Sequence, residues 1–85
     1  MYRIIFTKQA DKALRKMPRN TAQNIRDKLN RLSTDPYAHI PNAKSLQGRS
    51  GYRLRVGDWR VIYEIQDDRL VILVLKIAPC GGAYR

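Results

Sequence analysis

Three arginines, Arg53, Arg55 and Arg60, are the residues of this 85-residue chain best suited to bind phosphate. A guanidinium group presents a planar fork of N–H donors that matches phosphate oxygens, and it stabilises the extra charge of a pentacoordinate phosphorane. Arginine side chains stay protonated, so they are poor groups for proton transfer. The chemistry expected of this set is therefore phosphate binding and electrostatic stabilisation.

The segment 51–65 that contains these arginines has the alternating pattern of a β-hairpin. Gly57-Asp58 predicts a two-residue type II′ turn, because glycine adopts the positive φ that the first turn position requires. On one face this turn pairs apolar residues, namely Val56 with Trp59, Leu54 with Val61 and Tyr52 with Tyr63. On the other face it pairs Arg55 with Arg60, and Arg53 with Ile62. Like charges directly across a strand pair destabilise it, so this face is expected to bind a polyanion.

The composition points the same way and bounds the class of protein. Seventeen Lys and Arg against seven Asp and Glu give a net charge of +10, which predicts a nucleic acid or an acidic protein as partner. The length predicts one domain, residues 1–85.

Met1 leads into an apolar strand without a signal-peptide pattern, and no stretch is apolar enough to cross a membrane. We therefore expect a cytoplasmic protein with no membrane partner. One cysteine and one histidine form neither a disulfide nor a Cys/His metal set, and no cofactor is expected.

The rest of the chain predicts an α+β fold with the order β-α-α-β-β-β. Local patterns predict a strand over 2–6, helices over 8–17 and 20–33, a loop over 36–50, a turn over 66–69 and an interior strand over 70–77. Thr7 is expected to cap the first helix, and Pro18 to separate the two helices. We expect a mostly antiparallel sheet with a two-helix hairpin packed on one face and the arginines on the other.

Several short pieces, in this order and spacing, resemble a known family. They are Ala10 with Leu14 and Met17-Pro18, the helix end 29–32 before Asp35-Pro36, the step 46–48, the hairpin 52–63 and the closing Tyr84-Arg85. Together they resemble the RelE/ParE superfamily of toxins from type II toxin-antitoxin systems, and its RelE-type branch most closely. The resemblance covers the whole chain as one RelE-like toxin domain. It implies a metal-independent endoribonuclease, an mRNA interferase that cuts mRNA in the ribosomal A site and inhibits translation. The implied partners are the ribosome with its rRNA, the mRNA, and a RelB-like antitoxin protein that neutralises the toxin.

The resemblance also implies roles for individual residues. Arg53 and Arg55 match two basic residues of the family's hairpin, Arg60 matches its phosphate-binding arginine, and Tyr84 matches its C-terminal tyrosine. Cys80 departs from the pattern, because family members usually carry a catalytic arginine at this position. Cys80 is either a natural divergence that weakens the toxin or a substitution that inactivates a toxic protein. The matching residues around it favour the second explanation.

Metal-independent cleavage of RNA requires a proton to leave the 2′-OH and another to reach the departing 5′-oxygen. The only histidine, His39, lies in the predicted loop, so a mechanism with two histidines is excluded. We expect Arg55 and Arg60 to hold the scissile phosphate, Arg53 to hold an adjacent one, and Tyr84 to stack on a base or assist proton transfer. The ribosome would supply the near-attack geometry, which is worth about 7 to 11 kcal/mol in the best intramolecular cases.

Two alternatives remain open on the sequence. The first is a ParE-type poison of DNA gyrase, which would induce the DNA-damage response instead of halting translation first. The second is a non-catalytic module that binds RNA or antitoxin, for which Cys80 is the supporting feature. RNA binding without cleavage, even after Cys80→Arg, would favour this second alternative.

Overall fold

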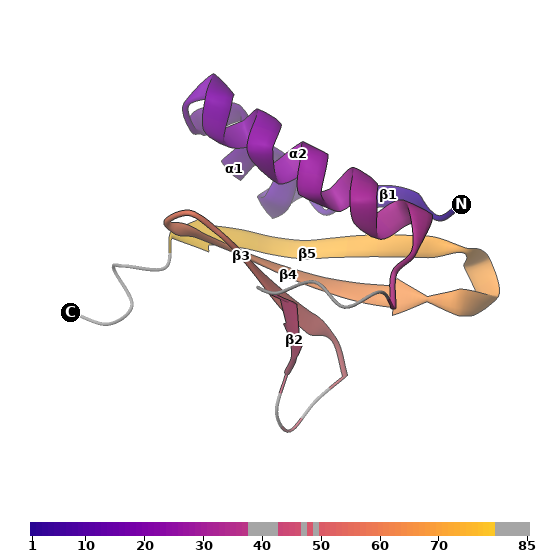
Figure 1. Cartoon of the computed structure of the whole chain (residues 1–85). Helices are drawn as coiled ribbons and strands as arrows, with labels where there is room; N and C mark the ends of the chain where they lie inside the picture. Colours follow the sequence, from indigo (N-terminus) through magenta and orange to yellow (C-terminus); the bar gives the residue numbers. More distant parts are fainter. Residues whose placement is uncertain (38–42, 47, 49, 80–85) are drawn as a thin grey trace.

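The computed structural model describes residues 1–37, 43–46, 48 and 50–79, and in them two helices cover one face of a five-stranded sheet (Figure 1). The strands are β1 (Arg3–Phe6), β2 (Ala43–Ser45), β3 (Tyr52–Val56), β4 (Trp59–Gln66) and β5 (Val71–Pro79). The helices are α1 (Lys8–Lys16) and α2 (Arg19–Thr34), and a 3-10 turn, η1 (Asp67–Arg69), joins β4 to β5. The sheet order is β1-β5-β4-β3-β2, with β1 parallel to β5 and the other neighbours antiparallel. The predicted fold class is confirmed.

The helices begin and end where the sequence predicted, to within one residue. Thr7 caps α1, because its Oγ1 accepts a hydrogen bond from the Ala10 amide at 3.3 Å. The same hydroxyl donates to the Leu75 carbonyl at 2.7 Å, which ties the start of α1 to β5. Pro18 precedes α2 and supplies the carbonyl for the Ala22 amide, so the two helices are separated by a very short connection.

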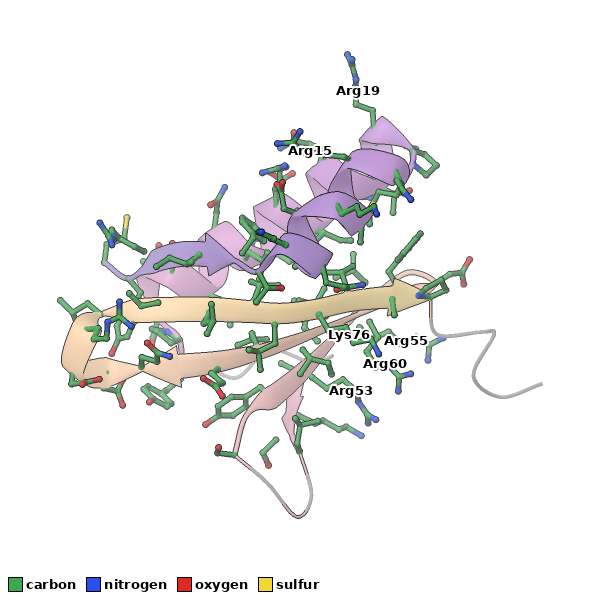
Figure 2. All side chains as sticks on the ribbon, turned by 180° about the vertical axis from the view of Figure 1, so that it is seen from behind. Arg15, Arg19, Arg53, Arg55, Arg60 and Lys76 are labelled. Atoms are coloured by element: carbon green, nitrogen blue, oxygen red, sulfur yellow. The ribbon has the colours of Figure 1, made fainter. Side chains whose placement is uncertain are left out.

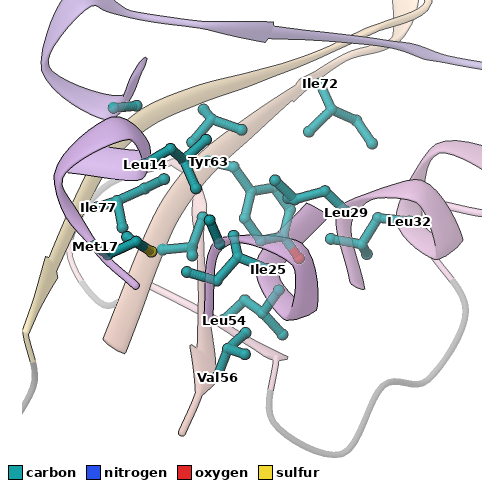
Figure 3. Close-up of a cluster of buried hydrophobic side chains, with 14 residues drawn as sticks. Leu14, Met17, Ile25, Leu29, Leu32, Leu54, Val56, Tyr63, Ile72 and Ile77 are labelled. Atoms are coloured by element: carbon teal, nitrogen blue, oxygen red, sulfur yellow. The ribbon is translucent and has the colours of Figure 1, made fainter. Parts of the chain in front are cut away.

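The core lies between the helices and the sheet (Figure 3). Apolar side chains recur at helical spacing on α1 and α2 and at alternate positions on β3 and β4. They pack into one cluster with Ile72, Val74 and Ile77 of β5. Its largest fully buried members include Ile25, Leu29, Leu32, Leu54, Tyr63, Ile72 and Ile77. Tyr63 stacks on Tyr52 with ring centroids 5.5 Å apart. The aromatic residues of the hairpin therefore belong to the core face, as predicted, and burial raises the pKa of Tyr63 to about 12.

The β3–β4 hairpin has the predicted register at every pair. Gly57 has a φ of 58°, whereas Asp58 does not have a positive φ. A type II′ turn requires this combination, with positive φ at the first turn position alone. The interior position of the strand predicted over 70–77 is also confirmed, because β5 lies between β1 and β4.

The predicted loop over 36–50 needs a correction, because β2 lies within it and pairs with β3. β2 is three residues long and lies at the sheet edge, so it has no apolar alternation from which to predict it. At the far end of β4, the predicted turn over 66–69 contains η1, and Leu70 follows it with a left-handed φ of 52°.

A carboxylate with two tyrosine partners joins three distant parts of the chain. Asp67 in η1 accepts hydrogen bonds from the hydroxyls of Tyr2 and Tyr37, each at 2.6 Å and each to a different carboxylate oxygen. These bonds hold the pKa of Asp67 below its usual value. The hydrogen bond to Asp67 raises the pKa of Tyr37 to about 12 and also raises that of Tyr2.

Candidate nucleic-acid interface

The face of the sheet turned away from the helices carries five cationic side chains near the β3–β4 turn. They are Lys44, Arg53, Arg55, Arg60 and Lys76, which we call the basic face. Figure 2 shows Arg53, Arg55, Arg60 and Lys76 together on the side of the sheet opposite Arg15 and Arg19 of the helices. The alternation of β3 explains this arrangement, because Leu54 and Val56 are buried while Arg53 and Arg55 are exposed.

The strand register arranges these cations in two rows across the sheet. The first row is Lys44, Arg53, Ile62 and Lys76, one residue from each of β2, β3, β4 and β5. The second row is Arg55, Arg60 and Ala78. Neighbouring strands are about 4.8 Å apart, and residues two positions apart along a strand are separated by about 6.5 to 7 Å. The basic face therefore presents two parallel rows of positive charge.

A pocket of about 260 Å³ opens between the two rows. It is lined by Leu46, Arg53, Arg60, Ile62, Lys76 and Ala78. Ala78 lies beside Arg60 across the β4–β5 pair, and its short side chain leaves the space above the sheet open. Cations from three different strands thus line one concave site on an otherwise pleated surface.

The charged groups of the basic face are all cations, which favours an anionic ligand. The Nε of Arg55 donates to the Gly57 carbonyl at 3.3 Å, so the turn holds its guanidinium at the end of the hairpin. Within the part of the chain that the structure describes, no carboxylate forms an ion pair with Arg53, Arg55 or Lys76. Glu64 shares this side of β4 but lines a different pocket, with Tyr37 and Tyr52. The local field here is therefore positive, and a phosphate would find several donors at once.

The structure brings together three of the five residues that the sequence predicted for the site. Arg53, Arg55 and Arg60 lie in adjacent rows of one hairpin, with Arg60 half-buried and the other two exposed. Cys80 and Tyr84 lie outside the described residues, and so does His39.

Sequence reasoning missed Lys44 and Lys76. Lys76 could have been suspected, because it is the one charged residue in the apolar run 70–77. Its row was not predictable, since the β4–β5 register shifts between Ile62 and Tyr63. Lys44 lies on the strand that was predicted as loop.

The fold and the basic face together define a small basic α+β protein whose open sheet face is suited to a polyanion. Residues 4–84 match the family described as the ParE toxin of type II toxin-antitoxin system, parDE. The chain belongs to the RelE/ParE superfamily of toxins from type II toxin-antitoxin systems, as the sequence resemblance predicted.

Two curated relatives carry RelE names. A RelE1 toxin of Methanocaldococcus jannaschii is 31% identical over 83 residues, covering 92% of this chain and 89% of the relative. A RelE-like toxin protein of Escherichia coli is 30% identical over 78 residues, covering 89% of this chain and 80% of the relative. The relatives therefore favour the RelE name, whereas the family description uses ParE.

Solved structures agree on the fold. The toxin in the archaeal RelE-RelB complex from Pyrococcus horikoshii superposes with a TM-score of 0.82 at 32% identity, covering 94% of this chain and 96% of that one. The toxin-antitoxin complex RelBE2 from Mycobacterium tuberculosis gives a TM-score of 0.75 at 23% identity, covering 92% and 96%, and it supports the fold alone. In the described residues, neither helix is long and apolar enough to span a membrane.

Proposed function

We propose that this protein is a ribosome-dependent endoribonuclease that cuts mRNA in the ribosomal A site and inhibits translation. It acts as a single RelE-like domain in the cytoplasm. The proposal rests on membership of the toxin superfamily, on relatives named RelE, and on the arrangement of the basic face. It needs no metal or organic cofactor, because the cations of the site stabilise charge on phosphorus directly.

The observation that carries the proposal is the direct pairing of Arg55 with Arg60. This pairing places two guanidinium groups across one rung, at a cost in stability that a bound phosphate would reverse. In our mechanism these two residues hold the scissile phosphate and stabilise the phosphorane, while Arg53 holds a neighbouring phosphate.

The arginines of the basic face are poor groups for proton transfer, because a guanidinium group stays protonated. Tyr84 is our candidate for the phenol that stacks on a base or assists proton transfer. Position 80 is our candidate for a further phosphate contact, occupied here by Cys80 where related toxins usually have arginine. The ribosome would hold the mRNA in line for attack, which explains how a site without histidine can work.

We further propose that an acidic RelB-like antitoxin is the protein partner. The relative from Pyrococcus horikoshii, which is 32% identical, is in a complex with RelB. A mostly apolar groove of about 490 Å³ runs between α1 and the ends of β4 and β5, lined in part by Met17, Trp59 and Ile77. Lys12 and Lys16 flank this groove. An amphipathic helix with apolar and acidic faces would satisfy both features.

The test of the function is expression in cells that lack an antitoxin, with two readouts followed in parallel. We expect incorporation of labelled amino acids to fall before any DNA-damage reporter responds, and Arg60→Gln to abolish the effect. An early DNA-damage response would instead support gyrase poisoning, the activity of the ParE-type branch. In the proposed site, Cys80 lacks the phosphate contact that an arginine would make. We therefore test Cys80→Arg in parallel with the unchanged protein.

A further inference from the structure

Lys76 lies in the same row of the sheet as Arg53, although the two residues are separated by 23 positions in the sequence. The register pairs Arg53 with Ile62 and Ile62 with Lys76, so the two cations flank one apolar residue on the same face. Lys44 extends the row on the other side of Arg53. Arg53 and Lys76 also line one pocket together, and Figure 2 shows both on this face.

This row is parallel to the row of Arg55 and Arg60, at a distance of two residues along the strands. That distance is about 6.5 to 7 Å. It is comparable with the separation of neighbouring phosphates in an extended single strand. A strand whose one phosphate lies at Arg55 and Arg60 would therefore bring the next phosphate over the pocket between Arg53 and Lys76.

The composition of the pocket supports a phosphate as its occupant. Its floor is formed by Ile62 and Ala78, which offer no hydrogen-bond acceptor from their side chains, and its walls carry cations from β3, β4 and β5. Lys76 is exposed and, within the described residues, makes no ion pair. A lysine ammonium contacts phosphate as a point charge and needs no fixed approach angle, so it suits a second, loosely oriented phosphate.

We propose that Lys76 and Arg53, extended by Lys44, form a second phosphate subsite that holds the RNA phosphate adjacent to the scissile one. The inference rests on the proposed function for the identity of the first subsite. The second subsite contributes binding and alignment of the strand, whereas Arg55 and Arg60 act on the reacting phosphate.

The test uses the full chain and a single-stranded hexanucleotide of 2′-O-methyl RNA, which lacks the attacking 2′-OH and cannot be cut. Affinity is measured at several salt concentrations for the wild type, Lys76→Gln and Lys28→Gln. Lys28 on α2 is the matched control, because its loss changes the net charge equally on the opposite side of the sheet. Thermal unfolding of each variant checks that the fold is kept.

We expect Lys76→Gln to weaken binding about tenfold at low salt. We also expect the slope of log K against log salt to fall by about 0.7, the change for one lost phosphate contact on a single strand. Lys76→Arg should restore both values. Equal affinities and slopes for Lys76→Gln and Lys28→Gln would overturn the subsite, and so would a failure of every variant to bind.

The outcome is separable from that of the proposed function. Loss of RNA binding in Lys76→Gln without any cleavage of A-site codons by the wild type or by Cys80→Arg would keep the subsite and reject the endoribonuclease. Cleavage of A-site codons together with unchanged RNA binding by Lys76→Gln would support the endoribonuclease and reject the subsite.

Discussion

Arg55 and Arg60 face each other directly across the β3–β4 hairpin, on the side of the sheet opposite α1 and α2. The hairpin is otherwise well built, with a glycine at the turn position that needs positive φ and buried apolar partners on the other face. The pair is therefore a local departure from the rules that stabilise strands, and such departures concentrate at functional sites.

Replacing one arginine of this pair should stabilise the protein while weakening its interaction with RNA. We expect Arg55→Gln to raise the free energy of unfolding by about 0.2 to 1 kcal/mol at low salt, because the like-charge pair is removed. The gain should shrink at 1 M salt, where charges are screened over about 3 Å. Denaturant unfolding measures both values.

Arg31→Gln is the control for this prediction. It removes the same charge from the last turn of α2, where a cation interacts favourably with the helix dipole. Stability should be unchanged or slightly lower. Arg55→Gln also removes the hydrogen bond from the Arg55 Nε to the Gly57 carbonyl, and that loss depends little on salt. A stability difference from the wild type that is the same at low salt and at 1 M salt would therefore show that the pair is not repulsive, and it would remove the main argument for a phosphate between the two residues.

Position 80 carries the second prediction. If an arginine there supplies a missing contact to the phosphorane, Cys80→Arg should raise the rate of mRNA cleavage by about 10² to 10³, the usual effect of one electrostatic donor. Cys80→Ser is the control, since it keeps the size of the side chain without adding charge. Growth of cells without antitoxin reports the difference, and equal growth with arginine, serine or cysteine would contradict the assignment.

Alkaline pH should destabilise the protein through Tyr63. Its pKa in the folded protein is about 12, above the value of about 10 for an exposed tyrosine, so the unfolded chain loses its proton first. Stability from this group is complete below pH 10 and falls between pH 10 and pH 12, by about 1.4 kcal/mol for each pH unit. Tyr63→Phe should reduce that slope. Tyr2 and Tyr37 titrate in both proteins, so equal slopes would show that Tyr63 is not protected by burial.

The hydrogen bonds of Asp67 predict an effect at acid pH. Its lowered pKa means that the two tyrosine hydroxyls stabilise the folded protein above the usual carboxyl pKa, and that this stability is lost as the pH falls through the lowered value. Tyr2→Phe and Tyr37→Phe should each raise the pKa of Asp67, measured by carboxyl carbon chemical shifts. A pKa that stays the same in both variants would mean that the tyrosines do not hold the carboxylate in solution.

The sequence predicted the hairpin well because its register depends only on local rules. A two-residue turn at Gly57-Asp58 and strict alternation on both arms leave one pairing that puts all apolar residues on the same face. The helices were similarly local, since Thr7 and Pro18 mark their starts.

Non-local features were not predictable. The pairing of β1 with β5 joins residues at opposite ends of the chain, and no local pattern specifies a parallel neighbour. The row that contains Lys76 depends on the irregularity between Ile62 and Tyr63, which shifts the β4 partner of Lys76 and of each β5 residue after it. The sequence therefore predicted the arginines of the candidate site but neither of its lysines.

The central claim is tested most directly by primer-extension mapping of an mRNA in reconstituted translation. We compare three proteins with and without ribosomes, namely the protein with its unchanged sequence, Cys80→Arg and Arg60→Gln. We predict cuts within A-site codons only when ribosomes are present, more of them with Cys80→Arg and none with Arg60→Gln. An mRNA left intact by both the unchanged protein and Cys80→Arg, or cut equally without ribosomes, would contradict the proposed function.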